Sequence, residues 1–416
     1  MTAHGSGFET SRPYNPRYVD IGINLSDPIF RGRYHGHQKH PDDLSGVVDR
    51  ARRVGCAKLM ITGSDLESAQ KALELSAEYC MSSVPSSPLC ARTDPHSSAN
   101  TCYATAGIHP CSSAIFGPAN IDHRSTEHTT PCEADPYAAM SEEHRPDRKR
   151  SASAVAQLAS LVANANKSHL VALGEFGLDY DRLNYCNRVI QKHSFESQLK
   201  FAASLQPQLP LFLHSRAAHV DFVALLKDAF GQELERLEKG GVVHSFTGTL
   251  DEMNELMDLG LYIGINGCSF KTAENCEVVK AVRLDRLMIE TDGPWCEIRP
   301  SHEGYKYLVE KTIPSGQDGT TSASTTTSAA PLPQQQQQHQ SRKKNQQKKA
   351  PEIPDRFKVV KKEKWEDGAM IKGRNEPCTI ERVAKVVAAV KSITLEEVCE
   401  AAWKNTIRVF GLGETI

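Results

Sequence analysis

Leu170-Val-Ala-Leu-Gly-Glu175 is an apolar run that ends in a carboxylate, and three later stretches repeat this pattern. They are Pro210-Leu-Phe-Leu-His214, Val242-Val-His-Ser245 and Leu287-Met-Ile-Glu-Thr-Asp292, which end at or beside an imidazole or a carboxylate. Runs that are apolar at every position, rather than at every second one, are typical of strands covered on both faces. The four stretches therefore predict buried strands of a parallel sheet, each with a polar side chain near its carboxyl end.

Four further apolar runs extend this sheet to eight strands. They cover Tyr18 to Asn24, Lys58 to Gly63, Tyr103 to His109 and Tyr262 to Ile265. Helical patterns lie between the runs, over Leu44 to Val54, Leu66 to Tyr79, Ser194 to Leu205, Val220 to Phe230 and Leu250 to Leu259. This alternation is typical of an α/β protein with a parallel sheet. Eight strands in succession favour a TIM (β/α)8 barrel, although an open doubly wound sheet gives a similar pattern.

Polar, low-complexity segments interrupt the alternation at about 82–100, 116–153 and 315–350. We expect them to be disordered insertions, because such compositions cannot bury enough apolar surface to offset the entropy of ordering. Two basic runs, Arg145 to Arg150 and Arg342 to Lys349, fall inside them. These runs would either add non-specific DNA affinity or a nuclear-import signal, or simply keep the insertions solvated.

A closing helix should follow the last insertion, since Thr394 and Glu397 have the spacing of a capping box. Without the insertions the chain approaches the ~250 residues typical of one barrel. We therefore expect a single barrel domain over residues 16–416, preceded by a flexible stretch at 1–15.

Charge and cysteine content exclude several classes of protein. Lys and Arg total 49 against 51 Asp and Glu, so the whole chain has no general attraction for nucleic acid or anionic membranes. The 12 cysteines include no C-x-x-C pair, and no secretion signal is recognisable. No apolar run approaches the ~20 residues that span a bilayer. We expect an intracellular protein of the cytoplasm or nucleus, without membrane association and with no obligatory protein partner evident.

Glu175, His214, His244 and Asp292 lie at or next to the ends of their predicted strands. Side chains at the carboxyl ends of barrel strands converge on one mouth, where barrel active sites lie. Any one of the four alone is better explained as a buried polar residue with a backbone partner. Four at equivalent places favour a site for a divalent ion. Glu175 would bridge two ions about 3.5–4 Å apart, and Asp292 would bind metal and accept a proton from the attacking water.

Short motifs follow one another in a fixed order around these strands. They are Asp20-Ile-Gly-Ile-Asn-Leu25, Gly107-Ile-His-Pro110, Gly174-Glu-Phe-Gly-Leu-Asp179, Phe212-Leu-His-Ser-Arg216, His244-Ser-Phe-Thr-Gly248, Glu290-Thr-Asp-Gly-Pro294 and Arg374-Asn-Glu-Pro377. In this order they resemble the signatures of the TatD family of deoxyribonucleases across nearly the whole chain. Three more motifs make the resemblance strongest to the eukaryotic TatD-domain branch: Asn266-Gly-Cys-Ser269, Pro294-Trp-Cys296 and Asn405-Thr-Ile-Arg-Val-Phe410.

The resemblance implies a TIM barrel of the amidohydrolase type that hydrolyses DNA phosphodiester bonds as a metal-dependent hydrolase. It implies Mg²⁺ as the cofactor, with Mn²⁺ or Zn²⁺ also suitable, and one or two ions per chain. It further implies 3′–5′ exonuclease activity. By the same resemblance, Glu175, His214, His244 and Asp292 are the metal ligands.

The first strand departs from the family pattern. Many relatives carry His-x-His at its end, where this chain has Gly22 and Asn24, and an Asn offers only a neutral carbonyl oxygen. One metal position is therefore expected to be weaker. Asp20 is either a ligand for that ion or a loop anchor. His109 either touches a substrate phosphate or caps its loop, and Arg216 either stabilises phosphate charge or forms an ordinary salt bridge.

Two motifs lie outside the predicted strands. Arg374-Asn-Glu-Pro377 precedes the closing helices and would fold back over the mouth. There Glu376 would either orient a ligand or pair with Arg374, and the structural pairing is favoured. His35 and His37 imitate His-x-His, but they belong to a polar segment that predicts a solvated loop.

Two other functions compete with DNA hydrolysis. The same ligand set would polarise a carbonyl group, so a metallohydrolase of another ester or of an amide is one alternative. A lysine at a strand end marks many amide hydrolases, and none of the eight predicted strand ends has one. The other alternative is a nucleic-acid-binding protein that has lost catalysis, against which the complete set of four ligands argues.

Overall fold

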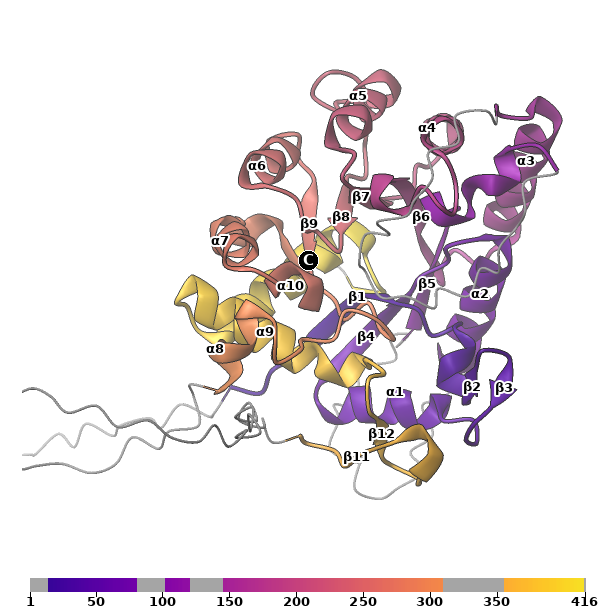
Figure 1. Ribbon diagram of the computed structural model, residues 1–416. Helices are drawn as coiled ribbons and strands as arrows, with labels where there is room; N and C mark the ends of the chain where they lie inside the picture. Colours follow the sequence, from indigo (N-terminus) through magenta and orange to yellow (C-terminus); the bar gives the residue numbers. More distant parts are fainter. Residues whose placement is uncertain (1–13, 81–101, 120–144, 310–354, 415–416) are drawn as a thin grey trace, which may run out of the picture.

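The computed structural model describes residues 14–80, 102–119, 145–309 and 355–414, with a central sheet of eight strands. Neighbouring strands are parallel and follow chain order: β1 Tyr18–Ile23, β4 Cys56–Ile61, β5 Cys102–Ala106, β6 Leu170–Asp179, β7 Leu211–Arg216, β8 Gly241–His244, β9 Tyr262–Ile265 and β10 Leu287–Ile289. The last and first strands approach each other, since Asp292 N donates to Gly22 O at 2.8 Å and Asn24 N donates to Gly293 O at 2.9 Å. The expected (β/α)8 barrel is therefore confirmed (Figure 1).

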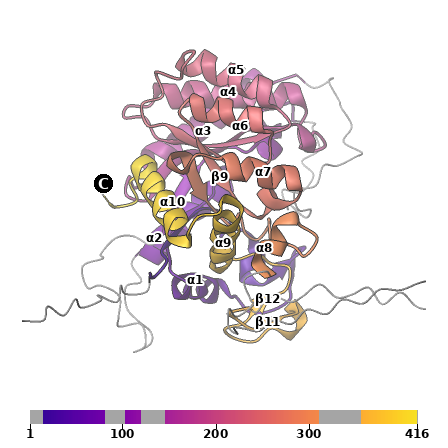
Figure 2. The same cartoon turned by 90° about the vertical axis from the view of Figure 1, so that its left-hand side faces the viewer.

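Helices surround the sheet in Figure 1. They are α1 Leu44–Arg53, α2 Leu66–Cys80, α3 Arg148–Asn164, α4 Arg188–Ser204, α5 His219–Phe230, α6 Leu250–Asp258, α7 Ala273–Ala281, α8 Lys306–Val309, α9 Ile380–Lys391 and α10 Leu395–Phe410. The predicted capping box is present: Thr394 accepts a hydrogen bond from Glu397 N and starts α10. Figure 2 shows α9 and α10 side by side. Among the described residues, no helix combines the length and the apolar character needed to cross a membrane.

Two short pairs of strands lie outside the barrel sheet. Strands β2 Arg33–Tyr34 and β3 His37–Gln38 form an antiparallel hairpin in the segment between β1 and α1. Strands β11 Val359–Val360 and β12 Met370–Ile371 pair in parallel in the segment between β10 and α9. Both pairs belong to loops that leave the carboxyl ends of barrel strands.

Large side chains fill the inside of the barrel. Ile21, Met60, Tyr103, Phe212 and Met288 are buried together there. At the amino end of the barrel, the last residues of the described chain cover this core. Tyr103 OH donates to Leu412 O at 2.5 Å, and Lys58 Nζ donates to the same oxygen at 3.0 Å. Among the described residues, the C-terminal segment therefore covers the amino end of the barrel.

The structure corrects the predicted position of Glu175 within its strand. The sequence pattern predicts that the strand ends at Glu175, but β6 continues to Asp179. The parallel pairing with β7 continues through Gly177 and Leu178 to Asp179, which pairs with Arg216. Because β6 is longer than its neighbours, Asp179 also reaches the mouth. The pattern missed this because Glu175 and Gly177 interrupt the apolar run on which the prediction rests.

The structure also corrects the second expected insertion, 116–153. Residues 120–144 lie outside the described residues, but α3 already begins at Arg148, so the basic run Arg145 to Arg150 ends in a helix. Asp147 caps this helix by accepting a hydrogen bond from Arg150 N at 2.9 Å, and Leu158 is fully buried. A cap and an apolar face outweigh the basic composition of the first turn. The expected insertions at 82–100 and 315–350 and the stretch 1–15 lie outside the described residues, apart from Tyr14 and Asn15.

A buried group of four charges fastens α1 to the segment that follows β12. Arg50 donates to Glu376 Oε2 at 2.7 Å and to Asp43 Oδ2 at 2.9 Å. Arg374 donates to Glu376 Oε1 at 2.8 Å and also to Asp43. All four side chains are at most 2% exposed, so each charge depends on its partners for compensation. Of the two roles considered for Glu376, the structure shows the pairing.

Candidate metal centre

A cavity of about 90 Å³ lies at the carboxyl ends of the strands. Its walls come from seven loops or strand ends, and most of the lining residues carry polar side chains. The lining residues are Asn24, Ser64, His109, Cys111, Glu175, Asp179, Arg182, His214, Arg216, His244, Ser245, Asp292 and Trp295. All four residues predicted as metal ligands are among them, so the structure brings them to one mouth as the sequence pattern predicts.

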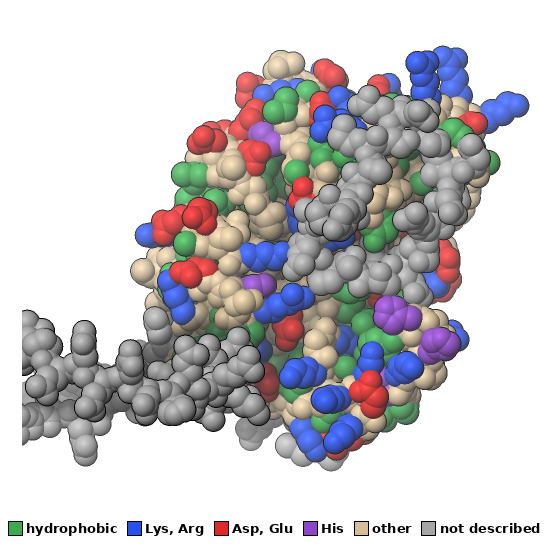
Figure 3. All heavy atoms as spheres, in the orientation of Figure 1, with side chains coloured by type: hydrophobic (Ala, Val, Ile, Leu, Met, Phe, Trp, Pro, Cys, Tyr) green, Lys and Arg blue, Asp and Glu red, His purple; other side chains and the backbone are tan. Residues whose placement is uncertain are grey.

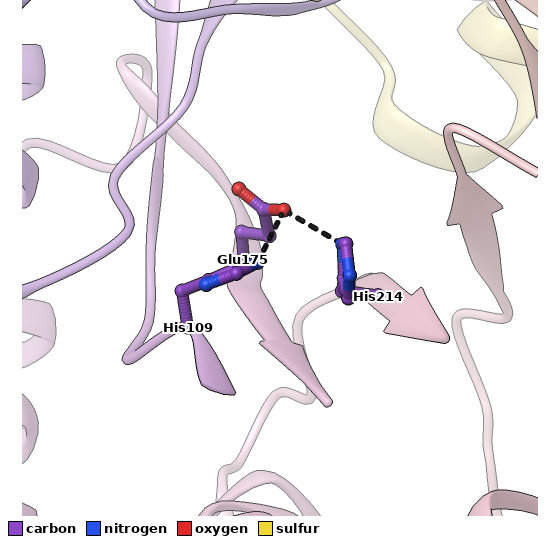
Figure 4. Close-up of side chains that lie close together, drawn as sticks. All are labelled: His109, Glu175 and His214. Atoms are coloured by element: carbon purple, nitrogen blue, oxygen red, sulfur yellow. Dashed lines mark hydrogen bonds and ion pairs between the residues drawn. The ribbon is translucent and has the colours of Figure 1, made fainter. Parts of the chain in front are cut away.

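Glu175 is the centre of the cavity wall. Its Oε1 atom lies 2.6 Å from His244 Nε2, 3.2 Å from His214 Nδ1 and 3.4 Å from His109 Nε2. Figure 4 shows His109 and His214 on either side of this carboxylate, with both rings directed toward it. His214 Nδ1 also lies 3.2 Å from His244 Nε2. Three imidazole nitrogens therefore lie within 3.4 Å of one carboxylate oxygen.

The charges of this cluster support one another. Burial opposes the ionised form of Glu175, but the surrounding imidazoles, His244 first, hold its pKa well below the usual value. Burial likewise opposes a charged His244, yet Glu175 and Glu290 raise the pKa of its imidazole well above the usual value. For His214, burial is outweighed by hydrogen bonds to Asp179 and Glu175, which raise its pKa. A divalent cation would replace these imidazolium protons, because it neutralises the same carboxylates.

Two carboxylates hold the imidazoles from behind. Asp179 Oδ2 lies 3.1 Å from His214 Nε2, and burial of Asp179 is outweighed by this contact, which lowers its pKa. Glu290 Oε1 lies 3.5 Å from His244 Nδ1 and accepts hydrogen bonds from Ser245 N at 2.6 Å and Asn266 Nδ2 at 3.1 Å. A carboxylate on the far nitrogen of a metal-binding imidazole fixes its tautomer and orientation. Of the three imidazoles, His214 and His244 have such a carboxylate.

His109 is oriented by its own loop. Its Nδ1 atom accepts a hydrogen bond from Cys111 N at 3.1 Å, so in the neutral ring the proton lies on Nε2, which faces Glu175. The ring meets that of His214 edge to face, with centroids 4.5 Å apart. Glu175, His214 and His109 offer ligand atoms within 4.8 Å of one another, as do His109, Cys111 and Asp179. His109 thus caps its loop and faces the cluster at once.

Asp292 lines the same cavity but has a different set of neighbours. Its Oδ1 accepts a hydrogen bond from Asn24 Nδ2 at 3.1 Å, and Cys296 Sγ lies 3.2 Å from Oδ2. Its backbone has φ 52°, and Ser245, which follows β8, has φ 49°. A positive φ costs energy for residues other than glycine and is found preferentially where a side chain must face a site. Contacts within the mouth, rather than the intrinsic backbone preferences of Ser245 and Asp292, therefore set the conformation at both positions.

The other predicted candidates divide into those at the mouth and one below it. Asn24, His109 and Arg216 line the cavity, and Arg216 Nη2 donates to Ser245 O at 3.4 Å. Asp20 lies beneath the mouth and accepts hydrogen bonds from Thr291 N at 2.9 Å and Gly22 N at 3.3 Å. Asp20 is fully buried, and burial raises its pKa to about 8. It thus anchors β1 to the segment after β10, as the second of its two interpretations predicts.

Gly22 leaves room for a neighbouring carboxylate. A Cβ atom at Gly22 would lie only 2.5 Å from Glu290 Oε2 and 3.2 Å from Phe212 Cζ. A histidine at this position, as many resembling proteins carry, would require Glu290 to move. The space beside β1 is therefore filled by Glu290, which the sequence pattern does not predict as a residue of the site.

The residues present suit a divalent cation. Carboxylate and imidazole groups are the ligands that such ions take, and here they converge from β6, β7 and β8 with neutralising partners behind them. The cluster can therefore bind a metal ion. The mouth also contains two guanidinium groups, Arg182 and Arg216, which suit an anionic ligand. Arg182 was not predicted, because it lies in a loop where nothing in the sequence distinguishes it from a surface arginine.

Comparison with known proteins gives a consistent set of relatives. A family model described as "TatD related DNase" matches residues 33–411. A protein of Schizosaccharomyces pombe named "Deoxyribonuclease Tat-D" is 39% identical, over 94% of this chain and 95% of its own length. A protein of Salmonella typhimurium named "3'-5' ssDNA/RNA exonuclease TatD" is 31% identical, over 66% of this chain and 78% of its own length. A crystal structure described as an uncharacterized amidohydrolase from Saccharomyces cerevisiae has a TM-score of 0.68 and 30% identity, and covers 95% of this chain and 100% of that one.

Proposed function

Because the chain belongs to the family of TatD-related DNases, we propose that it is a divalent-metal-dependent deoxyribonuclease whose reaction takes place at the mouth around Glu175. The observation that carries this proposal is the convergence of Glu175 with His109, His214 and His244 at the open end of the barrel. The names of the relatives favour a phosphodiester over the amide and other ester substrates, and they give no support to an inactive binding protein.

We assign the metal to Glu175, His214, His244 and Asp292, with Glu175 as the bridge if two ions bind. Mg²⁺ is the expected ion, because two carboxylates favour a hard cation, and Mn²⁺ or Zn²⁺ would accept the two imidazoles. His109 faces Glu175 and is the strongest further candidate ligand. Asn24 donates to Asp292, so it is better suited to orienting that carboxylate than to binding an ion.

The chain's own groups suggest a division of labour in the reaction. A divalent cation, when bound, supplies positive charge that polarises the phosphodiester and makes water a better nucleophile. Asp292 is the group proposed to accept the proton of the attacking water, since its carboxylate lines the cavity. Arg182 and Arg216 would bind the negative charge of the substrate phosphate through their planar donor groups. Asp179 and Glu290 hold His214 and His244 in orientation.

Polarity and location are inferred from a relative and from the cysteines. The name of the Salmonella relative favours 3′–5′ exonuclease action, with RNA as a further substrate. Among the described residues, Cys56, Cys111, Cys186, Cys276, Cys378 and Cys399 are free thiols, which suits the reducing cytoplasm or nucleus. We further infer a single domain over 16–416, since β1 at one end of the chain and α10 at the other pack together.

An end-labelled single-stranded DNA tests the proposal. With Mg²⁺, products that shorten one nucleotide at a time from the 3′ end support a 3′–5′ exonuclease, whereas internal fragments support an endonuclease. The same reaction with a chelator should give no products. Metal-independent cleavage, or no cleavage with Mg²⁺, Mn²⁺ or Zn²⁺, would contradict the proposed function.

A further inference from the structure

Beside the mouth lies a strongly basic surface, formed by residues 31–40 and 355–373 and called here the basic rim. It holds nine Lys and Arg against four Asp and Glu, whereas the whole chain holds 49 against 51. The basic residues are Arg31, Arg33, Lys39, Arg356, Lys358, Lys361, Lys362, Lys364 and Lys372, and the acidic ones are Asp355, Glu363, Glu366 and Asp367. The lower right of Figure 3 shows many Lys and Arg side chains gathered on this part of the molecule, with two histidines above them.

Part of this positive charge has no carboxylate to neutralise it. Arg31, Arg356 and Lys358 form ion pairs with Asp42, Glu381 and Glu366. Within the described part of the chain, no ion pair involves any of five other cations, all of them exposed: Arg33, Lys39, Lys361, Lys364 and Lys372. Exposed cations gathered without acidic partners repel one another, so their arrangement favours an anionic ligand over the free state.

The basic rim is an ordered unit rather than a loose tail. The rings of His40 and Trp365 stack with an interplanar angle of 10° and centroids 5.9 Å apart. Lys362 Nζ lies 4.8 Å from the centroid of Tyr34. Strands β2 and β3 form one half, and β11 and β12 the other. Because these contacts hold the two halves together, the backbone that carries the cations is ordered before any ligand binds.

The basic rim is continuous with the mouth through Asn375. Asn375 Nδ2 donates to Trp295 O at 2.7 Å and to Thr291 O at 2.8 Å, and Asn375 follows β12 directly after Arg374. Trp295 lines the cavity. The other half of the rim begins after Asn24, which also lines the cavity. Both halves therefore extend outward from the wall of the proposed active site.

The cavity itself is too small to hold more than a short piece of a nucleic acid. Its volume of about 90 Å³ lies well below the roughly 300–1,000 Å³ of sites that enclose a drug-sized ligand. A polynucleotide whose terminal phosphodiester lies in the cavity must therefore place its other nucleotides on the surface outside. A surface that carries unpaired cations along this exit would hold those nucleotides by their phosphates.

We propose that the basic rim binds the phosphate backbone of a single-stranded nucleic acid whose end lies in the mouth. This inference rests on the proposed function for the identity of the polyanion. The rim acts through charge, because its two aromatic rings, Tyr34 and Trp365, are engaged with Lys362 and His40. It should therefore favour long strands over short ones without preferring particular bases.

The test compares two triple variants of the full-length chain. One variant, Lys361→Ala with Lys364→Ala and Lys372→Ala, removes three exposed lysines of the basic rim that form no ion pair with another described residue. The matched control removes three exposed lysines at the amino end of the barrel: Lys167→Ala and Lys239→Ala lie just before β6 and β8, and Lys404→Ala lies on α10. The two variants have the same net charge, so any difference in their binding of nucleic acid must come from the position of the removed lysines.

Binding is measured by fluorescence anisotropy with labelled oligothymidylates of about 20 and about four nucleotides, in a chelator and over a range of salt concentrations. Each phosphate contact on a single strand contributes about 0.7 to the slope of log affinity against log salt, so loss of three should lower that slope by about 2. Near 0.1 M salt the long oligonucleotide should bind the rim variant up to about 100-fold more weakly. The short oligonucleotide and the control variant should show little change.

Equal binding of the long oligonucleotide by the two variants would overturn the proposal. So would an equal loss for both lengths, because the three lysines would then act inside the mouth. Failure of the proposed function looks different: the parent would then cleave no DNA with any metal, while the position-dependent loss of binding would remain. A rim that bound an acidic protein instead would leave the two variants indistinguishable in this assay.

Discussion

Replacing Glu290 with Gln tests how His244 is held for metal binding. Glu290 is fully buried and lies 3.5 Å from His244 Nδ1, on the side away from Glu175. Loss of such a carboxylate typically weakens metal binding by about 10–100-fold, which corresponds to about 1.4–2.7 kcal/mol. A glutamine of the same size keeps an acceptor oxygen for Ser245 N, so the fold should survive. We therefore expect Glu290→Gln to bind Mn²⁺ about 10–100-fold more weakly, as measured by titration calorimetry.

A double-mutant comparison separates this role from a general loosening of the mouth. In a His244→Ala background, Glu290→Gln should cause no further loss of Mn²⁺ affinity, because the imidazole through which Glu290 acts is gone. Thermal unfolding of the metal-free proteins serves as the control for folding. Unchanged Mn²⁺ affinity in Glu290→Gln, or the same loss with and without His244, would refute the reasoning.

Three further predictions concern stability and pH. Glu376→Gln leaves Arg50 and Arg374 without one of their buried partners, so the free energy of unfolding should drop by about 3–5 kcal/mol in urea, and an unchanged value would contradict this. Burial raises the pKa of Asp20 to about 8, so the folded protein keeps a proton that the unfolded chain releases near pH 4. Relative to Asp20→Asn, the free energy of unfolding of the parent should be highest below about pH 4 and should fall by about 1.4 kcal/mol per pH unit up to about pH 8. If the two proteins showed the same dependence of unfolding free energy on pH, the prediction would be refuted. Because the pKa of His244 is raised well above its usual value in the metal-free protein, metal binding should release protons and weaken as pH falls. Calorimetry in two buffers of different ionisation enthalpy measures this proton release, and the same binding enthalpy in both buffers would contradict the prediction.

The strand pattern predicted the barrel and its mouth because both depend on local sequence. A strand buried on both faces needs an apolar run. The residue at its carboxyl end lies at the mouth of the barrel, and this position does not depend on the conformation of the loops. For this reason the cavity contains Glu175, His214, His244 and Asp292, and β9 has the predicted bounds Tyr262–Ile265. Their roles as metal ligands remain a prediction.

What the sequence could not predict depends on contacts between distant segments. The sequence leaves open whether Asp20 is a metal ligand or a loop anchor. Its hydrogen bond from Thr291 N, 271 residues away along the chain, shows the anchoring contact. Asp179 was missed as a mouth residue because β6 is longer than its apolar run. Glu290 lies two residues before the predicted ligand Asp292, and only the tertiary structure shows that it fills the space beside Gly22.

The helix boundaries also differ in how well the sequence predicts them. Helix α5 begins within one residue of its predicted start, because a cluster of apolar positions marks its buried face. Helix α4 begins at Arg188, six residues before the predicted start, since its first turn is set by the Asn187 cap rather than by apolar residues. The first six residues of helix α3, Arg148 to Ser153, were assigned to an insertion because the basic first turn hides the apolar face behind it.

The most direct test of the central claim is metal-dependent DNA hydrolysis by the parent and by Glu175→Ala, with exposed Glu233→Ala as the matched control. The carboxylate of Glu175 meets three imidazoles in the mouth, so its removal should abolish both Mg²⁺-dependent cleavage of single-stranded DNA and calorimetrically detected Mn²⁺ binding, while Glu233→Ala retains both. If Glu175→Ala binds metal and cleaves DNA as the parent does, the reaction takes place without this centre and the account is wrong.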